Sequence, residues 1–221
     1  MKYSLKATSI IEAMMVLLIV VTGITWVYTL MTSSQKLANS TALRIEAIQI
    51  ARDGLESFTN IRNTNWVRFA ADYENCWNVL HYDINCIWDT GTSTDMRQAW
   101  VNQGFTIYRN SDNQFEVYRY GTFAGDARDY SDNSYRNAFQ VFKDNQGFYT
   151  QTGSLGVDKF DFAPIYTREI QIDYLQDDNS AGNSNDSKVQ VTAVVMWNDI
   201  ASTTPRELRM STLLTNWKSK Q

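Results

Sequence analysis

The stretch KATSIIEAMMVLLIVVTGITWVYTLM, residues 6–31, decides how the rest of the chain is organised. Its uncharged part, from Ala13 to Met31, would span roughly 28 Å as an α-helix, close to the thickness of a bilayer's hydrocarbon layer. Lys2 and Lys6 precede the apolar run, so the positive-inside rule predicts a cytoplasmic N-terminus and an extracytoplasmic remainder. The sequence therefore predicts a single-pass protein of the cytoplasmic membrane.

A carboxylate, Glu12, stands at the leading edge of this apolar run. Three interpretations compete for the segment. In a secretory signal peptide, the apolar core is shorter than this run and carries no charge. In a plain membrane anchor, Glu12 would rest at the level of the lipid headgroups. In the third interpretation, cleavage between Ala7 and Thr8 exposes an α-amine that neutralises the Glu12 of a neighbouring copy, which offsets a cost of about 2.5–3.5 kcal/mol for a charge in hydrocarbon.

These residues resemble the type III signal of type IV pilins and pseudopilins, in which a short basic leader precedes a small residue, the cleaved bond, a nearby glutamate and a long apolar helix. Here the leader would be MKYSLKA, cleavage would follow Ala7, Thr8 would become the mature N-terminus and Glu12 would be the assembly carboxylate. The resemblance implies cleavage by a prepilin peptidase, commonly followed by methylation of the new amine. The chain departs from the family in two ways. Most members have glycine and an aromatic residue around the cleaved bond, and the family often has a proline within the apolar helix.

The helical pattern continues beyond the membrane segment. An apolar stripe recurs every three or four residues, which predicts a helix with one buried face; its members are Leu43, Ala47, Ile50, Ala51, Leu55, Phe58 and Ile61. Charged residues are expected on the other side of this helix: Glu46, Arg52, Asp53 and Glu56. The asparagine-rich run TNIRNTN predicts the end of the helix, which would extend from about Ser9 to about Asn60.

The C-terminal third alternates between apolar and polar residues, which predicts three antiparallel strands. They are TREIQIDYLQ (167–176), SKVQVTAVVMWND (187–199) and RELRMSTLLTNWK (206–218). Two segments in the middle of the chain, GFTIYRNSDNQFEVYRYG and NAFQVFKDNQGFYTQTG, predict short hairpins. The apolar stripe of the first helix is the expected cover for the apolar face of the strands. The predicted fold is therefore α+β, with a long N-terminal helix packed on an antiparallel β-sheet.

The C-terminal strands also resemble the end of the PilV-like minor pilins, which carry a V-x-V-x-x-x-V-x-W strand and finish in LTNW. The two resemblances imply a pilin-like architecture in five segments. These are the leader (1–7), the transmembrane half of the helix (8–31), its amphipathic half (32–61), a variable region with a disulfide loop and hairpins (62–166), and a C-terminal meander (167–221).

Cys76 and Cys86 are the two cysteines of the chain, and an even count in an exported protein predicts a disulfide. The single histidine, His81, lies between them, so the sequence offers no Ser-His-Asp set and no zinc pattern. The aromatic residues near this loop, Trp66 and Trp77 among them, are expected in the core rather than on an adhesive surface.

Other chemistry finds little support in the sequence. The oxygen-rich segment DDNSAGNSND holds Asp177, Asp178 and Asp186, for which calcium binding is the alternative to simple turn chemistry. A net charge of −4 with 20% charged residues gives no basic surplus of the kind that nucleic-acid binding needs. No phosphate-binding loop or HExxH motif occurs, so we do not expect an enzyme.

The resemblance implies a minor pilin-like subunit of a type IV pilus or of a type II secretion-type filament. Its partners would be other pilins through the N-terminal helix, a prepilin peptidase and the cytoplasmic membrane, and its final location an extracellular or periplasmic filament. Two other classes stay open from the residues alone. One is a single-pass, membrane-anchored extracytoplasmic binding protein that forms no filament, and the other is a secreted hydrolase behind a signal peptide.

Overall fold

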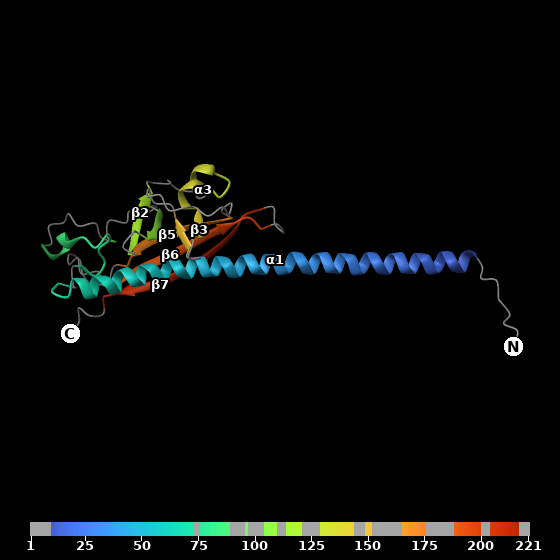
Figure 1. Ribbon diagram of the computed structural model, residues 1–221, viewed down its shortest axis with the longest axis horizontal. Helices are drawn as coiled ribbons and strands as arrows, with labels where there is room; N and C mark the ends of the chain where they lie inside the picture. Colours follow the sequence, from blue (N-terminus) through green and yellow to red (C-terminus); the bar gives the residue numbers. More distant parts are fainter. Residues whose placement is uncertain are drawn as a thin grey trace. The chain divides into compact units, whose positions relative to one another are not determined.

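The computed structural model describes residues 10–72, 76–88, 96, 104–109, 114–120, 129–143, 149–151, 165–175, 188–199 and 204–216. The chain divides into two compact units, residues 1–44 and 45–221. One long helix, α1 (Ile10–Arg68), contributes to both units (Figure 1). The predicted continuity between the apolar and the amphipathic halves of this helix is confirmed.

The second unit is built on a five-stranded sheet in the order β2-β1-β5-β6-β7, in which all neighbours are antiparallel. Its strands are β1 (Gly104–Arg109), β2 (Phe115–Tyr120), β5 (Tyr166–Tyr174), β6 (Lys188–Trp197) and β7 (Arg206–Thr215). A second sheet pairs β3 (Val141–Lys143) with β4 (Tyr149–Gln151). The predicted C-terminal meander and both predicted hairpin pairings are confirmed. They could be predicted because alternation of buried and exposed positions fixes strand register.

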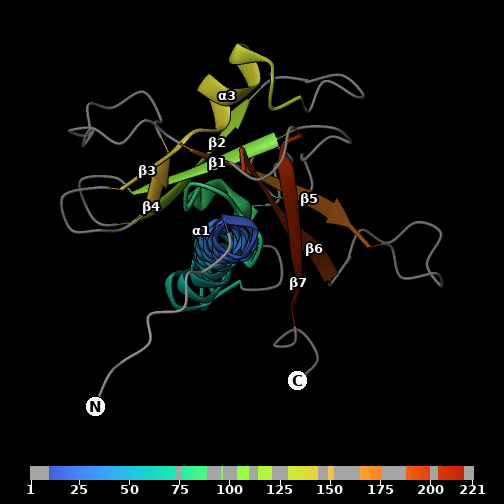
Figure 2. The same ribbon diagram turned by 90° about the vertical axis from the view of Figure 1, so that its right-hand side faces the viewer.

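The part of α1 in the second unit packs on one face of this sheet. The predicted apolar stripe is buried from Ala47 to Ile61, with Ala47, Ile50 and Phe58 fully inaccessible to solvent. Gly54 allows a close approach: a Cβ at this position would lie 3.0 Å from Ile170 Cδ1. Figure 2, which looks along α1, shows β3 and β4 to one side of the helix and β5, β6 and β7 to the other. The predicted α+β arrangement of a long helix on an antiparallel sheet is therefore confirmed.

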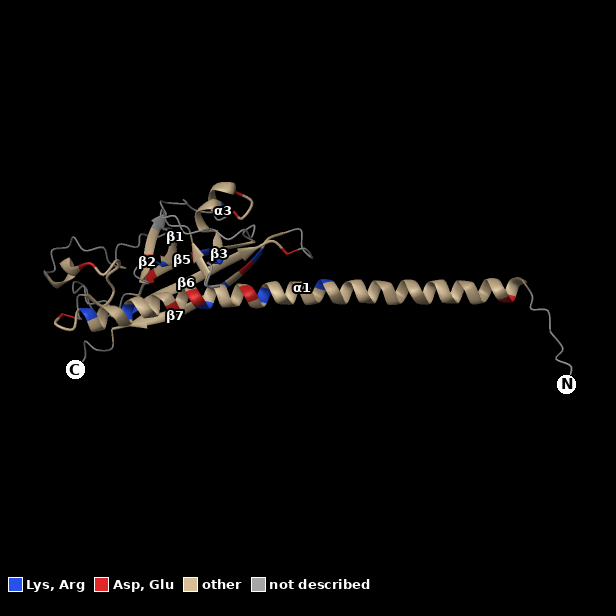
Figure 3. Ribbon diagram, in the orientation of Figure 1, with Lys and Arg blue, Asp and Glu red and all other residues tan. Residues whose placement is uncertain are grey.

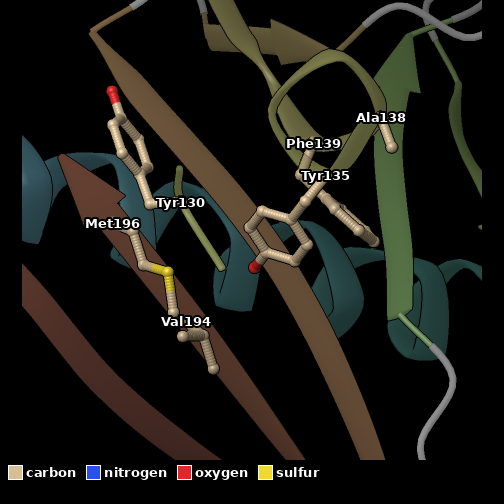
Figure 4. Close-up of a cluster of buried hydrophobic side chains, with 6 residues drawn as sticks. All are labelled: Tyr130, Tyr135, Ala138, Phe139, Val194 and Met196. Carbon is tan, nitrogen blue, oxygen red and sulfur yellow. The ribbon is translucent and has the colours of Figure 1, made fainter. Parts of the chain in front are cut away.

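The opposite face of the sheet is covered by a short helix, α3 (Asn133–Phe139). Figure 4 shows the buried cluster between them, which consists of Tyr130, Tyr135, Ala138, Phe139, Val194 and Met196. The predicted hairpin strand that begins with NAF, residues 137–139, was wrong in this part, because these residues belong to α3. Asp132 caps the helix by accepting a hydrogen bond from the Ser134 amide at 2.8 Å, and two aromatic residues one turn apart then reach the same apolar surface.

The first helix ends eight residues later than predicted, at Arg68 instead of Asn60. The predicted end was wrong because tertiary contacts override the weak helix propensity of the asparagines. The side-chain amide of Asn65 is fully buried and donates to the carbonyls of Trp77 and Val79 at 3.2 and 2.8 Å. The last two turns of α1 are thus held by the disulfide loop that follows them.

Gly104, at the start of β1, provides a test of this packing. A Cβ at residue 104 would lie 2.5 Å from Cζ of Phe139, a ring that is fully buried beside Tyr135. We expect Gly104→Ala to lower the free energy of unfolding by about 1–3 kcal/mol, the usual cost of overpacking. Urea denaturation of the chain in detergent micelles measures this change.

Gly23→Ala is the matched control, because a Cβ at residue 23 meets no atom within 4 Å. It should leave the urea midpoint of the second unit unchanged. Equal midpoints for both variants would contradict the packing described for Gly104.

Candidate functional site

The candidate assembly residue, Glu12, lies in the first turn of α1 as the structure describes it, and its side chain is exposed. An acidic residue at this end complements the positive end of the helix dipole. No charged residue follows on α1 until Lys36 (Figure 3). The predicted cleavage residues, Ala7 and Thr8, lie outside the described residues. Among the residues that are described, no side chain forms a hydrogen bond or ion pair with Glu12.

The apolar half of α1 exposes its side chains on every side. Each large apolar side chain between Ile10 and Met31 is at least 49% exposed, the minimum being Val20. This stretch is long and apolar enough to cross a membrane. Such a uniform apolar surface fits a membrane anchor, because a soluble helix would bury one face and cover the other with polar groups.

The threonine hydroxyls in this half are satisfied within the helix itself. Thr22, Thr25 and Thr29 donate to the carbonyls of Leu18, Thr22 and Trp26 at 2.9, 2.8 and 2.8 Å. Ser33 likewise donates to the carbonyl of Thr29 at 2.8 Å. These polar side chains therefore need no water or lipid partner, which removes most of the cost of placing them in a bilayer.

The predicted disulfide between Cys76 and Cys86 is present, with the two Cα atoms 5.2 Å apart. Both cysteines are buried in a small cluster with Phe69 and Val79, directly after the end of α1. His81 is exposed within the loop and has a φ of 57°. The loop therefore forms a compact cap on the last turn of α1.

Two of the aromatic residues near this loop, Trp66 and Trp77, are core residues. Trp66 and Trp77 are 6% and 3% exposed, which confirms the expectation for these two. The Trp66 indole donates to Asn216 Oδ1 at 3.4 Å, and this contact ties α1 to the end of β7. Trp100 lies outside the described residues.

The weak calcium candidates, Asp177, Asp178 and Asp186, also lie outside the described residues. Within the described parts of the chain, no group of three or more His, Cys, Asp or Glu side chains is arranged to hold a metal ion. The calcium interpretation therefore stays a prediction from the sequence.

Two polar clusters that the sequence analysis did not foresee hold α1 in the second unit. In the first, called the Glu46 cluster, the carboxylate of Glu46 accepts hydrogen bonds from Lys143 Nζ at 3.0 Å, Tyr149 Oη at 3.3 Å and Tyr166 Oη at 3.1 Å. Burial alone would raise the pKa of Glu46. The hydrogen bond and positive charge of Lys143, together with the hydrogen bonds from the two tyrosine hydroxyls, outweigh the effect of burial. The net result is a pKa below the ordinary value for glutamate.

The second, called the Arg168 cluster, lies two helical turns further along α1. The guanidinium of Arg168 is fully buried; its Nη1 donates to Asp53 Oδ2 at 2.8 Å and to the Ile50 carbonyl at 3.2 Å. Its Nε donates to Gln151 Oε1 at 3.1 Å. Burial lowers the pKa of Arg168, and the charge of Asp53 offsets part of that effect.

The expected placement of Glu46 and Asp53 on the polar side of α1 was wrong. Both flank the buried stripe closely enough for their flexible side chains to turn towards the sheet and its hairpin. Arg168 could have been found, because it shares the alternation of Ile170 and Ile172 and therefore the same sheet face. Its partner could not have been found so simply, because Asp53 is 115 residues away in the sequence.

Comparison with known proteins gave no match to a family model, a curated protein or a solved structure.

The disulfide gives one test of the cap on α1. Replacing both cysteines, Cys76→Ala with Cys86→Ala, removes a constraint on the unfolded chain, and we expect a loss of about 2–3 kcal/mol in the free energy of unfolding. Equilibrium unfolding in urea under oxidising conditions measures the loss. The same comparison in reducing buffer serves as the control, and a variant as stable as the oxidised wild type would contradict the expectation.

The Glu46 cluster gives a test through pH. Because the folded chain lowers the pKa of Glu46 below the unfolded value, its contribution to stability is present above about pH 4.5 and is lost as the pH falls through the folded-state pKa. We expect Glu46→Gln to be less stable than the wild type at pH 7 and to differ much less from it at pH 3. A gap in urea midpoints that stays constant between these pH values would contradict this linkage.

Proposed function

We propose that this chain is a minor pilin-like subunit that is inserted in the cytoplasmic membrane and assembles into a type IV pilus or a type II secretion-type filament through α1. The observation that carries the proposal is Glu12, a carboxylate at the start of a helix that then has no charge before Lys36. The α+β arrangement supports the proposal, because the same helix continues into a domain packed on an antiparallel sheet.

The depth of Glu12 follows from the length of the apolar run. About 20 helical residues span a hydrocarbon layer of about 30 Å, and counting that many residues back from Thr32 reaches Glu12. Trp26 and Tyr28 then lie near the outer boundary, where amphipathic aromatic residues are enriched. The carboxylate would thus sit at the inner boundary of the hydrocarbon, where Coulomb attraction is stronger than in bulk water.

Assembly would use the α-amine produced by cleavage after Ala7. An amine at Thr8 of one subunit and the carboxylate of Glu12 in its neighbour would form an ion pair as the apolar helices pack side by side. The packing itself would come from van der Waals contact between helices, because lipid offers no hydrophobic driving force. In this mechanism the second unit performs no chemistry and presents its surface outside the membrane.

A single-pass binding protein that forms no filament is the second candidate, since the same apolar helix would anchor it. The mature N-terminus separates the two. Mass spectrometry of the chain isolated from its host should find Thr8 as the first residue, carrying an added methyl group. A chain that retains Met1 would favour the anchored binding protein, and a soluble chain cut beyond Met31 would favour the secreted class.

Removal of the carboxylate tests the assembly role directly. We expect Glu12→Ala to insert in the membrane as the wild type does but to fall at least about tenfold in the sheared filament fraction, which corresponds to about 1.4 kcal/mol of lost pairing. Quantitative immunoblots of the membrane and filament fractions measure both quantities.

Glu56→Ala is the matched control, because Glu56 is an exposed carboxylate on the same helix in the second unit. It should assemble normally. Normal assembly of Glu12→Ala would rule out the proposed ion pair.

A further inference from the structure

Two consecutive residues of the disulfide loop have a left-handed backbone. The φ angles of His81 and Tyr82 are 57° and 54°, and these are the non-glycine residues with positive φ in the described parts of the chain. A left-handed conformation brings Cβ close to the following carbonyl oxygen, and a bulky aromatic residue such as tyrosine tolerates it poorly. Backbone strain of this kind persists only where surrounding contacts hold it.

The side chain of Tyr82 makes contacts that hold this conformation. Cζ of Arg68 lies 5.3 Å from the centroid of the Tyr82 ring. The Tyr82 hydroxyl oxygen accepts hydrogen bonds from the Thr64 side chain and the Phe115 backbone. Thr64 and Arg68 belong to α1, and Phe115 begins β2, an edge strand of the main sheet. One strained residue therefore joins the end of the helix to the edge of the sheet.

The loop consists of a well-packed part followed by a more weakly held part. Residues 77–80 are each at most 3% exposed, and Asn65 of α1 donates to two of their carbonyls. Residues 81–85 are exposed or half-buried. The backbone hydrogen bonds donated by Asp83 and Cys86 are long, at 3.4 and 3.5 Å, whereas about 2.9–3.0 Å is usual.

We propose that residues 81–85, called the Tyr82 lid, are a strained clasp between α1 and β2 that opens as a local unit. With the lid closed, Tyr82 lies against Arg68 and Phe115, and two residues are left-handed. With the lid open, both residues return to ordinary backbone conformations, and the link between α1 and β2 through Tyr82 is lost. The buried residues before the lid and the disulfide after it confine the movement.

The end of α1 keeps its other contacts when the lid opens. Trp66 still donates to Asn216, just after β7, and Asn65 still donates to the well-packed part of the loop. Opening therefore leaves the last turns of α1 in place. What changes is the junction between α1 and β2, where the groups that donated to Tyr82 become available to water or to another acceptor.

Hydrogen exchange followed by nuclear magnetic resonance on the full chain in detergent micelles tests the lid. His81→Gly and His81→Ala both remove the exposed imidazole, but only glycine relieves the left-handed conformation. We expect the amides of Asp83, Cys86 and Phe115 to exchange at least about fivefold more slowly in His81→Gly than in His81→Ala, because alanine disfavours positive φ. The amides of β6 should differ by less than about twofold, since opening is sub-global. Equal rates in the two variants, or an equal change in β6, would overturn the proposal.

A second variant tests the other side of the clasp. Tyr82→Phe keeps the ring beside Arg68 and removes the oxygen that accepts from Phe115, so the Phe115 amide should exchange at least about threefold faster than in the wild type. Val67→Ala is the control, because it shortens a side chain that is 80% exposed on the same turn of α1, and it should leave this rate unchanged. An unchanged rate in Tyr82→Phe would refute the clasp. Neither measurement needs a filament, so the outcome is independent of the experiments on Glu12 and Thr8.

Discussion

The second unit depends on the hydrogen bonds of one fully buried charged group, the guanidinium of Arg168. A buried charge must be paired and hydrogen-bonded, and removing one partner of such a pair typically costs about 3–5 kcal/mol. Asp53 and the Ile50 carbonyl bring α1 to this charge, and Gln151 brings the β3–β4 hairpin to it. Gly54 leaves room for the Arg168 side chain to cross the helix, since a Cβ there would lie 3.1 Å from its Cδ. Helix, sheet and hairpin therefore meet at one side chain.

The same cluster also strengthens the main sheet where β1 meets β5. Strands β1 and β5 share a single register pair, Phe105 with Ile170, whereas β5 and β6 pair along their full length. The Gln151 side chain supplies part of what the ladder lacks: it accepts from the Ile107 amide of β1 and donates to the Arg168 carbonyl of β5. A side-chain amide offers both a donor and an acceptor, so it can link two strands whose own pairing is short.

Periodicity made the main elements predictable from the sequence. The apolar stripe of α1 and the alternation in β5, β6 and β7 both follow from packing one face of an element against a core. Two errors have a common cause in long-range contacts. The helix was expected to end near Asn60 because its next turns are rich in asparagine, yet the amide of Asn65 finds buried carbonyls in the disulfide loop. The helix α3 was missed because its cap, Asp132, lies in a segment without a clear period.

The candidate functional residues likewise divide into those that could be predicted from the sequence and those that could not. Glu12 was visible in the sequence, because a carboxylate beside a long apolar run conflicts with its surroundings. Glu46 and Asp53 were placed on the wrong side of α1, because a helical pattern does not show where flexible acidic side chains find partners. The partners Lys143 and Arg168 lie 97 and 115 residues further along the chain. Only Arg168 could be predicted as buried from its neighbours in the sequence, because it alternates with Ile170 and therefore lies on the same sheet face.

The polar groups of α1 show how one helix can serve two environments. In the apolar half, the hydroxyls of Thr22, Thr25 and Thr29 bond to carbonyls of their own helix. In the second unit, the acidic side chains that flank the buried stripe bond to strands instead. Glu12 follows neither rule, because within the described residues it has no such partner. Under the proposed function, the partner of Glu12 would be the α-amine that cleavage after Ala7 would produce on a neighbouring copy.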